Sequence, residues 1–307
     1  MGRDVYDKMA AFHRRNGLSF DFNEETDMPK PIILITGATG QQGGATIREM
    51  MRRAERWHIR ALVRDLQAPK AMVLAKLGVE LMQGNLDHEH SLRTALRGVH
   101  GVLSVQSPMK IGPAGEERQG KLLATLAAQN GVRHFVQCSA GGAERRSGVP
   151  HFESKWAIEK HIAALGLTAT ILRPAAFMEN FSIFMFRTTM LSMMKTYLAP
   201  EQSMQLVSVR DVGWFAAEAF EKTDIFAGRR IELAGDNVTL QSASSILRRS
   251  GLRPAVSFKI PTQLCARLPE DFRLMFEWIA RDGFHANIPD LRHEHPALLT
   301  LRDWTQN

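Results

Sequence analysis

Residues 31–43 constrain the fold of this chain most, because a short apolar run leads directly into a turn with three glycines. The run predicts a strand, and residues 44–54 predict a helix. Gly37, Gly40 and Gly43 have the spacing G-x-x-G-x-x-G. Glycine at these positions permits a tight turn, close approach of a pyrophosphate, and close packing of the helix on the strand. The unit therefore predicts a dinucleotide site at the helix N-terminus, where free N–H groups face an anion.

Strand-like and helix-like segments alternate as far as residue 172. The predicted strands lie at residues 32–36, 59–63, 79–83, 101–105, 134–138 and 169–172. The predicted helices lie at residues 44–54, 69–77, 90–96, 117–130 and 154–165. Repeated strand–helix units imply parallel strands joined by right-handed crossovers. The predicted fold is therefore α/β, a doubly wound parallel sheet of the Rossmann type with helices on both faces.

The alternation weakens after residue 200, where we expect a smaller α+β lobe that closes over the strand ends. The predicted elements there are helices at 213–221 and 239–249, strands at 229–233 and 256–260, and mostly helix at 262–285. The predicted division is an N-terminal arm at 1–30, a Rossmann domain at 31–200 and a smaller lobe at 201–307, interleaved with it around the active cleft. Three interpretations of residues 1–30 stay open: a free arm, a docking element for another subunit of a homodimer, or a disordered segment.

The composition excludes several classes of protein. Of the 307 residues, 44% are hydrophobic and 23% charged, as in a globular protein. No apolar run could span a bilayer and the N-terminus lacks a signal-type core, so we expect a cytoplasmic protein without a membrane partner. The net charge of +7 comes from scattered basic residues without a nucleic-acid-binding motif. We therefore expect no direct nucleic-acid binding.

The cysteines and paired histidines lack the spacing of a metal site. Two cysteines, Cys138 and Cys265, are too few for a disulfide framework, and we expect both to be buried thiols. We predict surface histidines and no bound metal from the two His-x-His pairs, His88/His90 and His293/His295.

Arg64 follows the second predicted strand, 21 residues after Gly43. In dinucleotide-binding units an acid near this position binds the ribose 2′-hydroxyl, whereas an arginine accommodates a 2′-phosphate. Because a guanidinium forms a two-pronged, charge-assisted contact with phosphate, Arg64 favours NADP(H) over NAD. Lys70 is a second candidate phosphate ligand, and Asp65 would favour NAD if its side chain pointed inward.

Residues at the ends of later strands complete the predicted cofactor site, since ligands of such sheets bind beyond the carboxyl ends of the strands. Asn85 could hydrogen-bond the adenine edge, with Leu86 against its face. Gln106 follows the fourth strand, near the expected place of the nicotinamide ribose. Lys155 falls in the first turn of a helix, where it could hold the ribose hydroxyls and lower the pKa of a neighbouring acid.

A stretch rich in Phe and Met at residues 181–198 follows the sixth strand. Flexible apolar side chains fit an adaptable substrate pocket or lid. They fit an ordinary core helix equally well, and the sequence does not decide between the two. In the first case Phe177 and Asn180, which precede the stretch, line the substrate pocket.

These features resemble the NmrA-like family, a branch of the atypical short-chain dehydrogenase/reductases. The resemblance covers about residues 31–304 and leaves the N-terminal arm unexplained. Its carrying motifs are TGATGQQGG at 36–44, VR at 63–64, QGKLL at 119–123, HFESK at 151–155, RP at 173–174 with Phe177, EN at 179–180, VRDV at 209–212 and the closing segment at 295–304.

The resemblance implies a Rossmann core that binds NADP(H), with Arg64 at the 2′-phosphate and Lys155 at the nicotinamide ribose. Some members of the family reduce quinones or plant phenolics. Others are redox sensors that bind the dinucleotide and pass the signal to a transcription factor or another protein. The resemblance also implies that the pyrophosphate is lined by Gly37, Thr39, Gly40, Gln41, Gln42 and Gly43.

The chain departs from ordinary short-chain dehydrogenases, which need a tyrosine four residues before the lysine to protonate the substrate oxygen. The two tyrosines, Tyr6 and Tyr197, have no lysine four residues on, and His151 stands at that position before Lys155. An imidazolium could donate the proton, or the ring could merely hydrogen-bond the backbone. Lys155 and His151 are therefore the candidate catalytic residues.

Two functions follow from these residues. The first is an NADPH-dependent reductase of a quinone or other conjugated carbonyl, a small-molecule substrate that takes its proton from Lys155, His151 or water. The second is a non-catalytic NADP(H) sensor that regulates a protein partner, which requires unequal binding to two conformations. The lysine and the apolar stretch favour the reductase.

Overall fold

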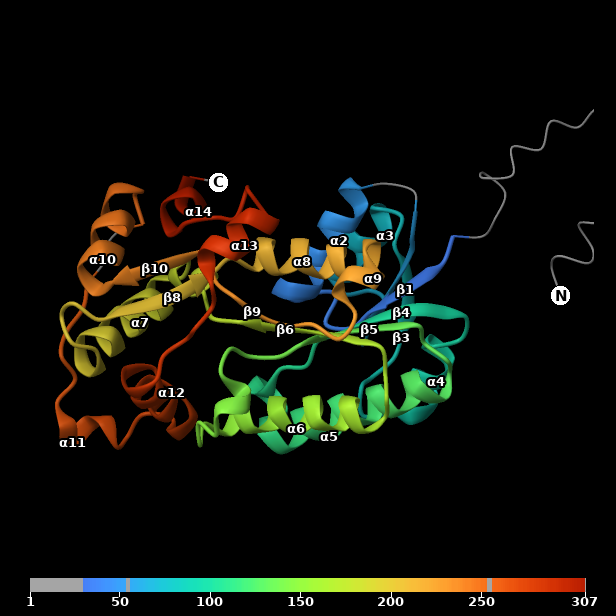
Figure 1. The fold of residues 1–307 in the computed structure, drawn as a ribbon, viewed down its shortest axis with the longest axis horizontal. Coiled ribbons are helices and arrows are strands. Elements are labelled where there is room, and N and C mark those ends of the chain that lie inside the picture. Colours follow the sequence, from blue (N-terminus) through green and yellow to red (C-terminus); the bar gives the residue numbers. More distant parts are fainter. Residues whose placement is uncertain (1–29, 54–55, 253–255, 307) are drawn as a thin grey trace, which may run out of the picture. The chain divides into compact units, whose positions relative to one another are not determined.

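A seven-stranded sheet forms the centre of the structure (Figure 1). The computed structural model describes residues 30–53, 56–252 and 256–306, so the predicted arm lies outside the described residues except for Lys30. Every neighbouring pair of strands is parallel, which confirms the predicted doubly wound sheet. In spatial order the strands are β3 (Glu80–Gln83), β2 (His58–Val63), β1 (Ile32–Ile35), β4 (Val99–Ser104), β5 (His134–Cys138), β6 (Ala169–Pro174) and β9 (Arg230–Leu233).

Helices cover both faces of this sheet (Figure 1). Ile33 and Ile35 of β1 belong to one apolar core, and Leu34 between them belongs to the core on the opposite face. Side chains of a strand alternate between faces, so a strand covered on both sides is apolar throughout. One face carries α2 (Gln41–Arg52), α3 (Pro69–Lys76) and α8 (Val209–Glu221), and the other carries α4 (Glu89–Ala95), α5 (Pro108–Gln129) and α6 (Pro150–Ala164).

Helices α2 and α8 pack against each other through a glycine. A Cβ placed on Gly213 of α8 would lie 2.7 Å from the carbonyl carbon of Ala45 and 2.9 Å from the backbone nitrogen of Thr46. Only a residue without a side chain permits this approach. The contact ties the segment after residue 200 to the helix that follows the glycine turn.

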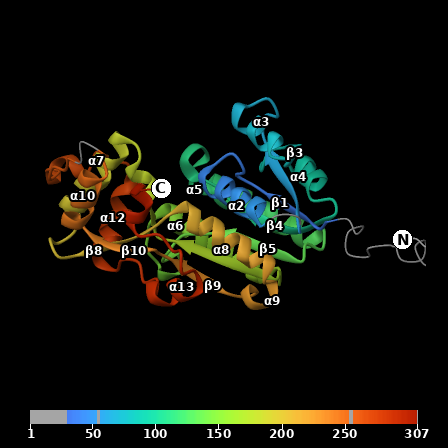
Figure 2. The same cartoon turned by 90° about the horizontal axis from the view of Figure 1, so that it is seen from above.

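A second sheet organises the rest of the chain, which Figure 2 shows beside the parallel sheet. Its strands are β10 (Asp236–Thr239), β8 (Ser203–Val207) and β7 (Ala176–Phe177), with β8 antiparallel to β10 and parallel to β7. A third apolar core, which includes Met190, Phe276 and Trp278, joins α7 (Phe184–Tyr197), α10 (Leu240–Arg249) and α12 (Glu270–Arg281). The remaining elements are η1 (Ala143–Arg145), η2 (Met178–Phe181), α9 (Thr223–Phe226), α11 (Thr262–Cys265), α13 (Ile288–Glu294) and α14 (Leu301–Gln306).

The strand predicted at residues 256–260 is wrong. The backbone N–H groups of Phe258 and Ile260 donate to the side-chain hydroxyls of Ser192 (3.2 Å) and Thr196 (2.9 Å) on α7, not to a neighbouring strand. Helical hydroxyls thus take the place of a strand partner. The sequence analysis also did not predict the short strands β7, β8 and β10.

The Phe- and Met-rich stretch divides into two parts. Met190, Met193 and Met194 are fully packed in the third core, as in an ordinary core helix. The first turn of α7 and the residue before it are different, because at least half of each side chain from Ile183 to Phe186 is exposed. The core-helix interpretation therefore holds for the buried methionines, and the pocket or lid stays a prediction for the exposed start of the helix.

Cys138 and Cys265 are free and buried, as the sequence predicts. Burial raises the pKa of the Cys138 thiol to about 12, so this side chain is packing rather than a nucleophile. Among the residues that the structure describes, no helix is long and apolar enough to cross a membrane.

The expectation of surface histidines is wrong for His295. The other three paired histidines are exposed, but His295 is buried and stacks on Trp214 with ring centroids 4.1 Å apart. Its Nε2 lies 3.2 Å from Oδ1 of Asp211. Within the described ranges no group of three or more His, Cys, Asp or Glu side chains could hold a metal ion.

Replacing Gly213 with alanine tests the contact between α2 and α8. Alanine is favoured over glycine inside a helix by roughly 1 kcal/mol, so a net loss of stability isolates the clash. We expect Gly213→Ala to lower the free energy of unfolding by about 1–3 kcal/mol, the usual effect of overpacking. Chemical denaturation measures this, with the exposed Arg210→Ala as a control on the same helix. A variant as stable as the parent would contradict the tight packing.

Candidate functional site

The turn between β1 and α2 keeps its glycines in close contact. Gly37 has a φ of 61°, in the left-handed region that glycine adopts without strain. Its carbonyl oxygen accepts a hydrogen bond from the Gly40 N–H (2.9 Å). A Cβ placed on Gly43 would lie 2.5 Å from the Gly37 carbonyl oxygen. A larger residue at position 43 would therefore push α2 away from β1.

The N-terminus of α2 is open. Gly40 is the N-cap residue, no side chain of the described residues caps the helix, and its first turn contains no acid. Thr39, Gly40 and Gln41 are exposed, and Gln42 is half-buried. The first N–H groups of the helix and the positive end of its dipole are thus available at the strand end, an arrangement that binds anions.

Arg64 is exposed at the end of β2, and no carboxylate of the described residues forms an ion pair with it. The carboxylate of Asp65 accepts a hydrogen bond from the Gln67 N–H (2.8 Å), which holds it in the turn before α3. Lys70 is exposed in the first turn of α3. The basic side chains of this loop are therefore available to an anion, whereas Asp65 is bound locally.

The amides predicted at later strand ends are engaged by the protein. The Asn85 side-chain oxygen accepts from the Asp87 N–H (3.1 Å), and Leu86 is half-buried against the core that holds α4 and α5. The Gln106 side chain is buried and donates to the Ser104 hydroxyl (2.8 Å). The backbone carbonyl of Gln106, not its side chain, lies next to Lys155.

Lys155 is buried at the ends of β4 and β5. Its Nζ donates to the carbonyl oxygens of Gln106 (3.2 Å) and Cys138 (3.1 Å), and it lies 2.9 Å from Oε1 of Glu116. An ammonium has three N–H donors. Two of them form hydrogen bonds here, because the contact with Oε1 of Glu116 is an ion pair without hydrogen-bond geometry. In this conformation Lys155 joins two strand ends to α5, and one of its three donors has no hydrogen-bond acceptor among the described residues.

Glu116 is a residue of the site that sequence reasoning missed. It is fully buried, and its second carboxylate oxygen accepts from the Ser154 hydroxyl (2.6 Å). A buried ammonium needs such a partner because an isolated buried charge is strongly unfavourable. Nothing in the local sequence separates Glu116 from the half-exposed Glu117 beside it, so only the packing of α5 on α6 identifies it.

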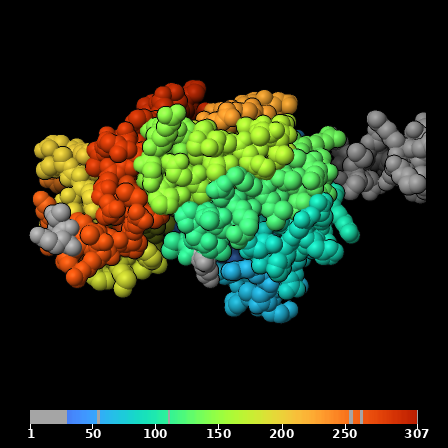
Figure 3. Space-filling model, turned by 90° about the horizontal axis from the view of Figure 1, so that it is seen from below, coloured from blue at the N-terminus to red at the C-terminus, as the bar shows by residue number. Residues whose placement is uncertain are grey.

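His151 lies one helical turn before Lys155 and turns to a different partner. Its Nδ1 is 2.7 Å from Oδ2 of Asp271, and its backbone N–H donates to Oδ1 of the same carboxylate (2.9 Å). Burial alone would raise the pKa of Asp271, but the hydrogen bonds and charge of His151 outweigh it and hold the pKa below its ordinary value. The pair links α6 to α12, whose residues lie against α6 in Figure 3.

Phe177 and Asn180, the predicted pocket residues, are half-buried in β7 and η2. Between them Glu179 turns to the protein: its carboxylate accepts from the Ser208 hydroxyl (3.0 Å), the Val209 N–H (3.1 Å) and the Trp304 indole (3.0 Å). Burial raises the pKa of Glu179 above its ordinary value. Glu179 thus fixes η2 to α8 and α14.

A second buried charge network lies beyond β5 and β6, and the sequence did not predict it. The Arg173 guanidinium donates to both carboxylate oxygens of Glu159 (3.1 and 2.6 Å), and the Ser139 hydroxyl donates to one of them (2.5 Å). Arg173 also pairs with Glu144 (3.0 Å). The network holds the strand ends rigid beside Lys155.

The parallel sheet and the open glycine turn at its strand ends define a Rossmann-type α/β protein. The chain belongs to the NmrA-like family, whose sequence model matches residues 29–284.

Two relatives illustrate the similarity in sequence. The chain is 30% identical over 166 residues to the NmrA-like family domain-containing oxidoreductase malD of Malbranchea aurantiaca. The aligned residues make up 50% of this chain and 49% of that protein. It is 31% identical over 153 residues to Quinone oxidoreductase 2 of Escherichia coli (strain K12), 49% of this chain and 50% of that protein. The aligned part thus spans about half the length of these curated relatives.

Two solved structures share the fold over nearly the whole chain. One is the NADPH-dependent quinone oxidoreductase QOR2 of Escherichia coli complexed with NADPH, with a TM-score of 0.74, 24% identity and coverage of 89% of this chain and 98% of that one. The other is Nmra, a negative transcriptional regulator, with a TM-score of 0.74, 19% identity and coverage of 91% and 95%. One fold therefore carries both an enzyme and a regulator.

Removing the Glu116 carboxylate tests the buried pair. We expect Glu116→Gln to lower the free energy of unfolding by about 3–5 kcal/mol, because it leaves the Lys155 ammonium buried without its anion. The matched control is Glu117→Gln, which breaks a half-exposed pair with Lys121 and should change stability by less than about 1 kcal/mol.

A double-mutant cycle with Lys155→Met separates the pair from its surroundings. The loss in the double variant should be smaller than the sum of the two single losses. Additive losses would show that the two groups do not interact.

Proposed function

We propose that this protein binds NADP(H) across the carboxyl ends of β1, β2, β4 and β5 and uses it to reduce a quinone or another conjugated carbonyl. The observation that carries the proposal is the open N-terminus of α2 behind the glycine turn. Gly40 would leave room for a phosphate to reach the backbone, while Gly37 and Gly43 hold the turn tightly against α2. The N–H groups there have no competing cap among the described residues. Thr39, Gln41 and Gln42 would line the same pyrophosphate.

The choice of NADP(H) over NAD rests on the loop after β2. Arg64 is exposed and unpaired among the described residues, whereas the carboxylate that could select NAD is bound to the Gln67 N–H. A guanidinium here would grip the 2′-phosphate in a bidentate contact. The complex of QOR2 with NADPH, a protein of the same fold, supports this choice.

The remaining predicted residues would position the other end of the dinucleotide. Asn85 and Leu86 would lie at the adenine, and Gln106 and Lys155 at the nicotinamide ribose. Two of the three Lys155 N–H groups already donate to backbone carbonyls, and only the third would be left for a ribose hydroxyl. We therefore assign it first a positioning role, in which its charge, balanced by Glu116, holds the ends of β4 and β5 together.

The proposed class of substrate, a quinone or another conjugated carbonyl, follows from the proton donors that are available without the usual tyrosine. When bound, NADPH supplies a hydride, which carries two electrons and one proton. A quinone that accepts it becomes a hydroquinone anion and needs one further proton, which water or His151 can provide, so no tyrosine is required. The exposed apolar first turn of α7, with Phe177 and Asn180 before it, offers a surface for a flat, apolar acceptor.

A second function, a non-catalytic NADP(H) sensor that regulates a protein partner, has its own support. Lys155 is held by two backbone carbonyls and by its ion pair with Glu116, and His151 is held by Asp271, so both predicted catalytic side chains are bound to the protein. A transcriptional regulator also shares this fold.

Reversing the charge of Arg64 tests the cofactor assignment. We expect Arg64→Glu to weaken NADP⁺ binding by about 10- to 100-fold, because a charge-assisted phosphate contact is lost, and to leave NAD⁺ binding within a few-fold of the parent. Titration calorimetry with each nucleotide measures both affinities. The exposed Arg48→Glu on α2 is a matched charge reversal. Equal effects of the two variants would overturn the assignment of Arg64.

The reductase and the sensor differ in turnover. We expect the full chain to oxidise NADPH in the presence of simple quinones, with Phe177→Ala raising KM for the quinone by about tenfold through lost apolar contact. The absorbance of NADPH follows the reaction. If a broad panel of quinones and conjugated carbonyls gives no turnover while NADPH and NADP⁺ bind with different affinities, the sensor replaces the reductase.

A further inference from the structure

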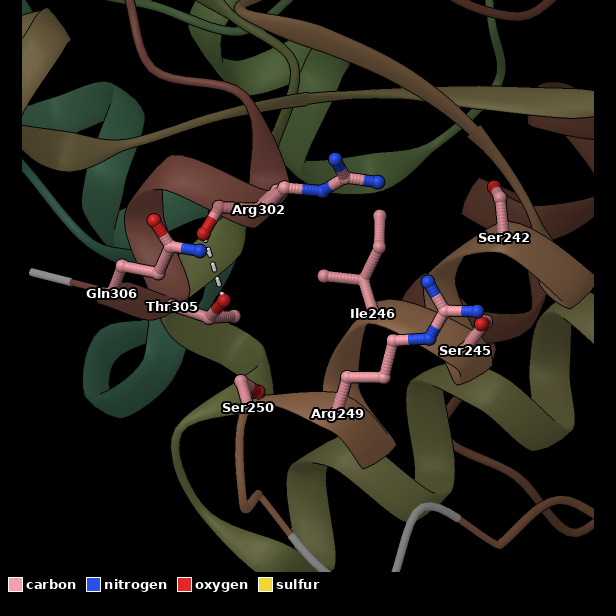
Figure 4. Close-up of a pocket in the computed structure, with 8 residues that line it drawn as sticks. All are labelled: Ser242, Ser245, Ile246, Arg249, Ser250, Arg302, Thr305 and Gln306. Atoms are coloured by element: carbon pink, nitrogen blue, oxygen red, sulfur yellow. Dashed lines mark hydrogen bonds between the residues drawn. The ribbon is translucent and has the colours of Figure 1, made fainter.

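A hollow of about 580 Å³ lies between α10 and α14, away from the predicted cofactor residues. Its residues come from the length of α10 with its C-cap residue, and from the short helix α14 (Figure 4). None of them belongs to the site described above. The lining consists of Ser242, Ser245, Ile246, Arg249, Ser250, Arg302, Thr305 and Gln306.

Two guanidinium groups face this hollow from opposite helices. Arg249 of α10 and Arg302 of α14 are both exposed, and neither forms an ion pair with a carboxylate of the described residues. The carboxylate of Asp303, the acid next to Arg302, accepts from the Thr300 N–H (3.1 Å) and hydroxyl (2.6 Å). These hydrogen bonds, together with the charges of Arg292 and Arg302, hold the pKa of Asp303 below its ordinary value. Two like charges around one cavity repel each other unless an anion lies between them.

The hydroxyls and the apolar wall of the hollow narrow the class of ligand. The hydroxyls of Ser250 and Thr305 donate to backbone carbonyl oxygens of their own helices (3.0 and 2.8 Å). Ser245, which precedes Arg249 by one turn of α10, has no hydrogen-bond partner among the described residues. Ile246 separates the two arginines and supplies an apolar surface. The polar groups of the hollow without a partner among the described residues are thus the two guanidinium groups, the Ser245 hydroxyl and the Gln306 amide. The two positive charges make this set favour an anionic ligand.

We propose that this hollow is a second ligand site, which binds a small organic anion with at least two phosphate or carboxylate groups. Arg249 and Arg302 each take one charged group, Ser245 adds a hydrogen bond, and the carbon part of the ligand packs on Ile246. Bidentate contacts from two arginines specify two planar or tetrahedral oxyanions rather than a single ion. The site is independent of the dinucleotide proposal, since it shares no residue with it.

Occupation of this site has a path to the predicted substrate pocket. Trp304 lies between Arg302 and Thr305 in α14, and its indole N–H donates to Glu179 (3.0 Å). Glu179 lies next to Asn180 in η2. Glu179 and Trp304 thus connect α14, which carries Arg302, to η2, which carries Asn180.

Titration calorimetry with pyrophosphate and with citrate at constant ionic strength tests the proposal on the full chain. The two probes distinguish phosphate from carboxylate recognition. We expect saturable binding of at least one probe to the parent, and about tenfold weaker binding in Arg249→Gln and in Arg302→Gln, because each removes one charge-assisted contact. The matched control is Arg248→Gln, a neighbouring exposed arginine of α10 outside the lining, which should bind as the parent does.

The control variants also give the outcomes that overturn the proposal. If Arg248→Gln weakens binding as much as the two lining variants, the anion responds to general surface charge and the site is refuted. If Arg64→Glu removes the binding while the lining variants keep it, the probe occupies the strand ends instead. No binding of either probe to the parent likewise contradicts the site. Thermal unfolding of every variant confirms that these exposed substitutions leave the fold intact.

Discussion

The close contact between β1 and α2 is the constraint on which the rest of the site depends. Gly43 lies so near the Gly37 carbonyl that no side chain fits between them, and this closeness aims the first N–H groups of α2 across the sheet edge. Gly213 of α8 permits a similarly close contact, because its lack of a side chain lets α8 approach the backbone of α2. Residues distant in sequence thus fix one helix end, and that helix end sets where an anion can rest.

The sequence predicts the sheet well because parallel strands buried on both faces are short, apolar and bounded by glycine turns. β1 is the clearest case, since its three buried residues alternate between two cores. The second sheet escaped prediction because its strands have two to five residues and lie among helices. The segment 256–260 has strand composition, but its partners are hydroxyls of α7, and no local pattern reveals a tertiary partner of that kind.

The residues of the candidate site also differ in whether local sequence or tertiary packing determines them. Positions set by local geometry, such as Gly37, Gly40 and Gly43, follow from spacing alone. Partners of buried charges do not, because Glu116 reaches Lys155 only through the packing of α5 on α6. The consequence for chemistry is that the lysine predicted at the ribose is already paired with Glu116 and donates to two backbone carbonyls, so the fold holds this lysine in place before any ligand arrives.

A crystal structure of the full chain grown with NADPH tests the central claim most directly. The account predicts the pyrophosphate against the backbone N–H groups of the first turn of α2, and the 2′-phosphate within hydrogen-bonding distance of the Arg64 guanidinium. Nucleotide bound elsewhere on the protein, or a glycine turn that stays uncovered at saturating NADPH, would contradict it.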